Sequence, residues 1–290
     1  YQPQEVNDAL SEKAFDNYIK ALNYNKRFLL QQDVDGLTRF KTSVDDQSKT
    51  GSYEFFDFSI GVIEGRIKTV SSMYKEILSE PFDFTEEETV NLGSKIDYSS
   101  NDEELKERWR KILKYNVMTR LATKIDVQEK ASEKGDSSFI MIPLDSLERA
   151  ARKDILKNHN DWFNRLERMS RKDRLAQYVN AITKVFDPHT NYFPPAEKEN
   201  FDIRMSGRLE GIGAQLQEKD GYIKVVKIIP GSPSAMQGDL EANDLILKVA
   251  QGEEDAIDIV DAKINDAVKL IRGKKGTEVR LTVQKVDGSK

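Results

Sequence analysis

The sequence predicts an α+β protein of two domains, a mostly α-helical one over residues 1–205 and a smaller β-rich one over residues 206–290. The length of 290 residues is typical of about two domains. Apolar residues recur every three or four positions through most of the first two hundred residues, which indicates helices packed on one face. Ten of the 16 glycines fall in the last 84 residues, among short runs of alternating apolar and polar residues that indicate strands.

Helical periodicity is clearest after Ser100-Asn101-Asp102-Glu103, a capping-box pattern that marks a helix start. One apolar stripe follows over about six turns, formed by Leu105, Trp109, Ile112, Leu113, Val117, Leu121 and Ile125. Further helices are predicted over residues 11–30 and 53–78, from about residue 145, and from Ser170 to the residue before Pro188. Thr85-Glu86-Glu87-Glu88 is a second capping box. Asp33-Val34-Asp35-Gly36 lacks the glutamate that a calcium loop needs and is interpreted as an ordinary loop.

The second domain begins after a linker, Pro194-Pro195 and the polar residues behind it. Strands are predicted over residues 209–217, 222–229, 244–249 and 277–286, with helices over 234–237 and 260–272. Lys219-Asp220-Gly221 and Pro230-Gly231-Ser232-Pro233 are turn signals between these elements. Short strands with two helices predict a compact, partly open β-barrel or sandwich.

Composition excludes several classes of protein. A net charge of −5 argues against a general nucleic-acid binder. The chain has no cysteine and two histidines, so we expect no disulfide, metal site or cofactor. No apolar run is long enough for a transmembrane helix. Residue 1 is Tyr, which suggests a removed signal peptide, and Asp287-Gly288 predicts a hairpin whose return strand is missing, so we expect a fragment.

The most informative motif is Leu209-Glu210-Gly211-Ile212-Gly213-Ala214, in which two glycines precede a predicted strand. Glycines let a ligand approach backbone N–H groups, which in such a bend form a nest for an anion. A peptide C-terminal carboxylate is a suitable anion, and the following strand, to Leu216, can pair with the peptide. An ordinary glycine turn remains the alternative. A dinucleotide fingerprint is excluded, because the third glycine is absent and a strand follows.

A groove beside this strand is predicted from the last helix, where Ile264, Val268 and Ile271 share one face. Plain core packing of these three residues is an equally open interpretation. Asp187-Pro188-His189-Thr190-Asn191-Tyr192 contains a histidine without an evident nucleophile, and a turn stabilised by side-chain hydrogen bonds is the favoured interpretation. We therefore predict no catalytic residue in this chain.

Several separated motifs, in this order, resemble the tail-specific proteases, also called C-terminal processing peptidases. They are Phe15-Asp16-Asn17-Tyr18, Leu29-Leu30, Asp33-Val34, Phe82-Asp83-Phe84-Thr85, the 187–192 segment, the 209–214 loop and Leu270-Ile271-Arg272-Gly273-Lys274-Lys275-Gly276. The resemblance implies that residues 206–290 are a PDZ domain that binds substrate C-terminal tails. It assigns the carboxylate loop to Gly211, Ile212, Gly213 and Ala214, and we expect Arg208 to assist electrostatically.

The resemblance also implies a separate peptidase core with a Ser nucleophile and a Lys base, which would follow the PDZ domain. The complete protein is thus expected to be a bacterial, periplasmic or otherwise exported serine endopeptidase, and this chain alone to be inactive. Expected partners are protein C-terminal tails, with an adaptor or self-association through the helical domain. The rival hypothesis is a non-enzymatic helical scaffold with a degenerate PDZ domain.

Overall fold

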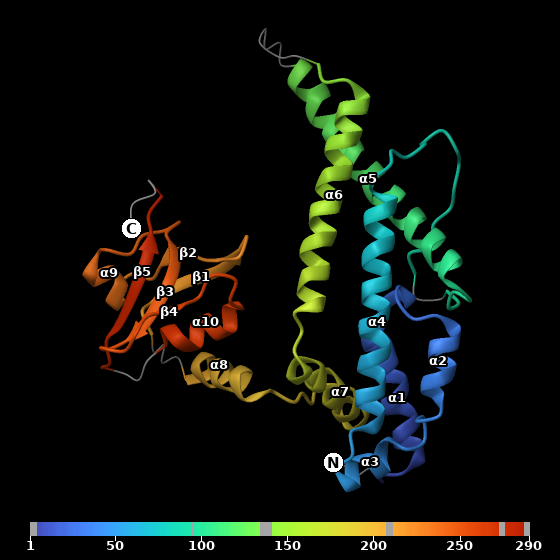
Figure 1. Cartoon of the computed structure of the whole chain (residues 1–290), viewed down its shortest axis with the longest axis horizontal. Coiled ribbons are helices and arrows are strands. Elements are labelled where there is room, and N and C mark those ends of the chain that lie inside the picture. The colour runs from blue at the N-terminus through green and yellow to red at the C-terminus, as the bar shows by residue number, and fades with distance from the viewer. Residues whose placement is uncertain (1–4, 94–95, 134–140, 207–210, 273–275, 287–290) are drawn as a thin grey trace. The chain divides into compact units, whose positions relative to one another are not determined.

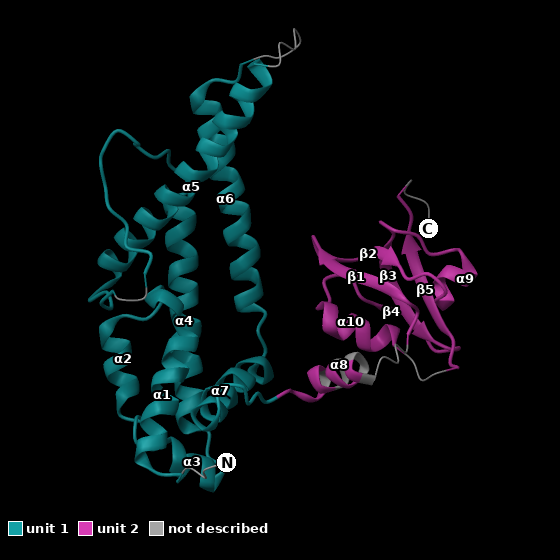
Figure 2. Cartoon of the chain, turned by 180° about the vertical axis from the view of Figure 1, so that it is seen from behind, with its two compact units in different colours: residues 1–192 teal, residues 193–290 magenta. Residues whose placement is uncertain are grey.

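The chain forms two compact units, residues 1–192 and residues 193–290 (Figures 1 and 2). The computed structural model describes residues 5–93, 96–133, 141–206, 211–272 and 276–286. The first unit is helical and the second combines an antiparallel sheet with helices. The predicted α+β class is therefore confirmed.

The first unit is built from long and short helices that pack around one apolar core. Its elements are α1 (Asp8–Leu22), a 3-10 turn η1 (Tyr24–Lys26), α2 (Gln31–Thr38), α3 (Val44–Thr50), α4 (Glu54–Ile77), α5 (Asp102–Glu133), α6 (Leu144–Glu167) and α7 (Arg171–Phe186). α1 packs on α7 and α5 on α6, while α4 contacts α5, α6 and α7. The predicted stripe on α5 is buried from Leu105 to Leu121.

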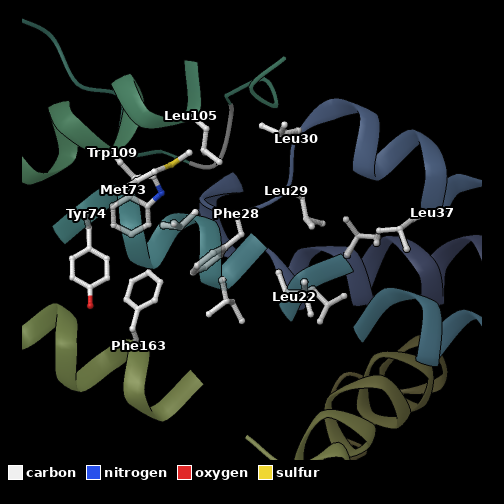
Figure 3. Close-up of a cluster of buried hydrophobic side chains, with 14 of the residues drawn as sticks. Leu22, Phe28, Leu29, Leu30, Leu37, Met73, Tyr74, Leu105, Trp109 and Phe163 are labelled. Carbon is white, nitrogen blue, oxygen red and sulfur yellow. The ribbon is translucent and has the colours of Figure 1, made fainter. Parts of the chain in front are cut away.

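The core of the helical unit combines aliphatic side chains with aromatic rings that contact one another (Figure 3). Trp109 is fully buried, and its indole N–H donates to the carbonyl of Arg27 at 2.8 Å. The rings of Tyr74 and Phe163 pack with centroids 4.5 Å apart, and Trp109 lies 6.1 Å from Phe163. Tilted and edge-on arrangements at such distances stabilise beyond the burial of apolar area alone.

Two predictions about the first helices are wrong. Residues 11–30 are not one helix: α1 ends at Leu22, and Asn25 and Lys26 have positive φ angles of 54° and 51°. The chain turns there because the Asn23 side chain accepts from the backbone N–H of Phe28 at 2.8 Å. The predicted loop at residues 33–36 lies within α2, where Asp33 accepts from the N–H of Leu30 at 2.8 Å and caps the helix.

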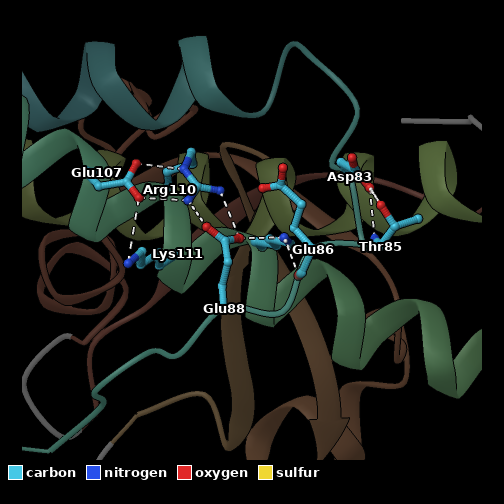
Figure 4. Close-up of polar contacts among 8 residues, drawn as sticks. Asp83, Thr85, Glu86, Glu88, Glu107, Arg110 and Lys111 are labelled. Atoms are coloured by element: carbon cyan, nitrogen blue, oxygen red, sulfur yellow. Dashed lines mark hydrogen bonds and ion pairs between the residues drawn. The ribbon is translucent and has the colours of Figure 1, made fainter.

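The segment between α4 and α5 also departs from the prediction, because no helix begins at Thr85. The Thr85 N–H and hydroxyl instead donate to Asp83, at 2.8 and 2.7 Å, which forms a local turn. Glu88 pairs with Arg110 and Lys114 of α5 (Figure 4). These two cations lower the pKa of Glu88 to about 2. The capping-box pattern thus marks a segment held to α5 by ion pairs.

Other helix ends follow the sequence. Ser170 and Asp173 form a capping box at the start of α7, with the Ser170 hydroxyl accepting from the Asp173 N–H at 3.2 Å. α7 ends at Phe186, before Asp187-Pro188. The expected linker after Pro194, however, is helix α8 (Pro195–Ser206). Proline is favoured at the first helical position because its φ is already suitable and its missing N–H is not needed there.

The second unit contains an open five-stranded antiparallel sheet. Its further elements are β1 (Ala214–Lys219), β2 (Tyr222–Ile228), α9 (Pro233–Gln237), β3 (Leu245–Gln251), β4 (Ile257–Asp258), α10 (Ile264–Ile271) and β5 (Val279–Gln284). The strand order is β1-β2-β3-β4, and β5 pairs with β3. The sequence missed only the two-residue β4 among these strands.

The β1–β2 hairpin turns at Asp220 and Gly221, whose positive φ angles of 51° and 82° suit a two-residue hairpin turn. One face of the sheet packs against α10, around the buried residues Ile223, Val225, Ile246, Val249 and Ala267. β1 begins at Ala214 rather than at the predicted residue 209. The glycines before it have φ angles of 141° and 76°, which are not those of a strand.

Candidate functional site

The glycine loop is held to the body of the second unit by its carbonyl groups. The Ile212 carbonyl accepts from the N–H of Ser234 at 3.0 Å. The Gly213 carbonyl accepts from the N–H of Ile229 at 2.8 Å and from the Ser232 hydroxyl at 3.2 Å. A side chain on Gly213 has no room, because its Cβ would lie 2.0 Å from the Cβ of Ser232.

These bonds fix the direction of two N–H groups. In a trans peptide the N–H points opposite to the carbonyl of the preceding residue. The N–H groups of Gly213 and Ala214 therefore point away from α9 and β2, toward the open side of β1. Adjacent N–H groups that point the same way form a nest that suits an anion such as a carboxylate. That Gly211, Ile212, Gly213 and Ala214 bind a carboxylate stays a prediction.

β1 lies at one end of the sheet and pairs with β2 along one side. The β1–β2 pair contains a β-bulge whose extra residue, Val226, lies on β2, so the alternation of hydrogen bonding along β1 is kept. Gly213 bonds Ile229, just after β2, so Gln215, Gln217 and Lys219 also face β2. The N–H and C=O groups of Ala214, Leu216 and Glu218 then face the other edge. No strand covers that edge within the described ranges. Three β1 residues are thereby available for main-chain pairing.

α10 contacts β1 and is the element expected to form the other side of the predicted groove. The side chains of Ala214, Leu216 and Glu218 are half-buried, whereas their neighbours Gln215 and Gln217 are exposed. From α10, Ile264 and Val268 are half-buried. Ile271 is 3% exposed and belongs to the core cluster, as Ala267 does. Ala214, Leu216 and Ile264 thus pack against one core cluster, of which Ile271 is a buried member rather than a surface residue.

The two ends of the groove carry charged side chains that the sequence did not single out. At the glycine end, Cγ of Arg272 lies 3.8 Å from where a Cβ of Gly211 would be. At the other end, the Glu218 carboxylate accepts from the N–H of Ile264 at 3.2 Å. Arg208 lies outside the described residues. The sequence offered one signal for Glu218. Alternate residues of a strand share a face, so Glu218 lies on the same face of β1 as Ala214 and Leu216.

The two histidines make local contacts. The Nδ1–H of His159 donates to the Ile155 carbonyl at 2.8 Å, and burial among aromatic rings lowers the pKa of His159. Asp187 accepts from the backbone N–H of His189 at 2.7 Å and from its ring Nδ1 at 3.1 Å. These contacts lower the pKa of Asp187 and confirm the predicted side-chain-stabilised turn.

Two features are absent from the described part of the chain. It contains no group of three or more His, Asp or Glu side chains placed to hold a metal ion. None of its helices combines the length and the apolar character needed to cross a bilayer.

Comparison with known proteins identifies the family. Residues 1–196 match the model of the tail specific protease N-terminal domain, and residues 201–284 match that of the PDZ domain. The chain belongs to the tail-specific protease family. It is 28% identical over 293 residues to the tail-specific protease of Haemophilus influenzae, an alignment that covers 100% of this chain and 39% of the relative. The predicted resemblance is therefore confirmed.

Other relatives are also bacterial. The carboxy-terminal processing protease CtpA of Bacillus subtilis is 33% identical over 159 residues, which cover 54% of this chain and 30% of that protein. The PDZ domain of a carboxy-terminal protease from Vibrio cholerae, solved in complex with peptide, is 42% identical. That match has a TM-score of 0.26 and covers 26% of this chain and 78% of the other. The chain thus spans only 39% and 30% of the two full-length relatives.

Proposed function

We propose that the second unit binds the C-terminal tails of proteins between β1 and α10. The observation that carries this proposal is the pair of N–H groups at Gly213 and Ala214, which point toward the open side of β1. A tail carboxylate would bind these N–H groups, and the tail would add a strand to β1. Leu216, Ile264 and Val268 would contact apolar side chains of the tail. Gly211 and Ile212 complete the loop.

The test is a fluorescence-anisotropy titration of the full chain with an N-terminally labelled peptide, Gly-Ser-Gly-Ser-Gly-Gln-Ala-Val-Ala-Val. The control is the same peptide with an amidated C-terminus, which lacks the negative charge. We expect saturable binding of the free acid, and at least tenfold weaker binding of the amide. Equal binding of both peptides, or binding of neither by a folded sample, would overturn the proposal. The second result would favour a helical scaffold with a degenerate PDZ domain.

We further propose that the complete protein is an exported, periplasmic serine endopeptidase and that this chain is its recognition portion. Membership in the tail-specific protease family supports this proposal, as does the coverage of only 39% of the Haemophilus influenzae relative. The helical unit would then support the recognition domain or bind an adaptor or a second copy. Cleavage of a tailed substrate by the complete protein, but not by this chain, is the expected result. Fractionation of cells that express the complete protein tests its location.

A further inference from the structure

Glu218 occupies a distinctive place in the groove, because its side chain connects the two walls. Glu218 is the second-last residue of β1. Its side chain reaches the first residue of α10, where its Oε2 accepts from the Ile264 N–H at 3.2 Å. The residue before the helix, Lys263, makes no capping bond with its own side chain. A carboxylate at a helix N-terminus is favourable because it satisfies a free N–H and complements the helix dipole. Glu218 therefore caps α10 from the opposite wall.

Main-chain pairing defines which tail residue would meet Glu218. If the last tail residue pairs with Ala214, antiparallel pairing brings the third-last residue to Leu216 and the fifth-last to Glu218. Directly opposed residues place their side chains on the same face of the sheet. The fifth-last side chain would therefore lie beside the Glu218 carboxylate, at the end of the groove away from the glycine loop.

The charged residues nearest to Glu218 along these elements are Lys219, Asp261 and Lys263. Lys219, the next residue on β1, is exposed and points to the opposite face of the strand. The β1–β2 turn is tied to the segment before α10 by the Asp261 N–H, which donates to the Gly221 carbonyl at 2.7 Å. This tie brings Asp261 to the same end of the groove as Glu218, while Lys263 carries a positive charge there.

We propose that Glu218 selects tails by charge, favouring Lys or Arg at the fifth-last position over Asp or Glu. This inference rests on the proposed function, since it assumes that a tail pairs with β1. The hydrogen bond to Ile264 holds the carboxylate at one place, so less side-chain entropy is lost when a cation approaches. The pair is near solvent, and exposed pairs of this kind change binding by about two- to fivefold.

The experiment compares three labelled peptides that differ only at the fifth-last residue, Gly-Ser-Gly-Ser-Gly-X-Ala-Val-Ala-Val with X as Lys, Gln or Glu. Each is titrated against the full chain at low salt. Glu218→Gln removes the charge but keeps a side-chain oxygen that accepts from Ile264. Glu278→Gln makes the same charge change before β5, the strand at the far side of β3 from β2.

We expect the Lys peptide to bind the unaltered chain two- to fivefold more tightly than the Glu peptide. Glu218→Gln should bring the affinities of the Lys and Glu peptides together, whereas Glu278→Gln should keep the preference. Equal affinities for the unaltered chain, or a preference that survives Glu218→Gln, would overturn the role of Glu218 while leaving tail binding intact. Failure of every peptide to bind would overturn both proposals.

Discussion

Replacement of Gly213 by alanine tests the geometry of the glycine loop. Both Gly213 and Gly231 have a φ of 76°, so alanine at either site meets the same unfavourable backbone conformation. That conformation costs about 1–2 kcal/mol. The two sites differ in the room available for a side chain. A Cβ on Gly213 would lie 2.0 Å from Cβ and 2.5 Å from Oγ of Ser232, while a Cβ on Gly231 would have no other atom within 4 Å. Overpacking at Gly213 should cost about 1–3 kcal/mol more.

Hydrogen exchange at β3, followed by mass spectrometry on the full chain, measures this difference within the second unit. An extra 1–3 kcal/mol makes exchange by global opening of the unit roughly 5- to 150-fold faster for Gly213→Ala than for Gly231→Ala. Trp109 and Trp162 both lie in the helical unit, so tryptophan fluorescence reports whether that unit stays folded. Ser232→Gly removes the clashing side-chain atoms but not the backbone strain, so in the Gly213→Ala background it should bring exchange back toward that of Gly231→Ala. Equal exchange in the two alanine variants, or no restoration, would refute the reasoning.

Two further predictions concern the helical unit. Phe163→Ala removes a ring that is 1% exposed and should lower the free energy of unfolding by about 3–5 kcal/mol. Urea denaturation followed by Trp109 and Trp162 fluorescence measures this free energy. A loss under about 1 kcal/mol would contradict the packing of Phe163 in the core. The Glu88 ion pairs lower its pKa from 4.5 to about 2, so their stabilisation is complete above pH 4.5 and is lost as the pH falls toward 2. Protease cleavage of residues 79–93 should therefore increase as the pH falls from 4.5 to 2. Glu88→Gln should raise cleavage at pH 7. Unchanged cleavage in both cases would argue that the Glu88 ion pairs do not hold this segment to α5.

The parts of the fold that were predictable are those set by local pattern. The α5 stripe and the Ser170 cap depend on spacing within one element, and both are found. The break after Leu22 was missed because it depends on one side chain, Asn23, reaching the backbone of Phe28. The capping-box pattern at Thr85 was misleading for a related reason. Asp83 accepts from the Thr85 N–H, the group that the Glu88 side chain would bind in a capping box.

The candidate site was predictable in its backbone and less so in its side chains. Gly211 and Gly213 could be identified from the sequence because backbone positions with positive φ angles favour glycine. Periodicity placed Ile264, Val268 and Ile271 on one face of α10. It does not tell core from groove, and the depth of Ile271 depends on how α10 packs against the sheet. The positions of Arg272 and Glu218 depend on contacts between elements distant in sequence, for which no local pattern exists.

The most direct test of tail binding at β1 is amide hydrogen exchange at single-residue resolution, by NMR on the full chain with and without the free-acid peptide. Leu216 and Glu218 have N–H groups facing the open edge, so their exchange should slow when the peptide is added. Gln215 and Gln217 already bond β2 and should change much less. Slowing confined to β5, or no slowing at Leu216 and Glu218 under saturating peptide, would contradict tail recognition at this strand.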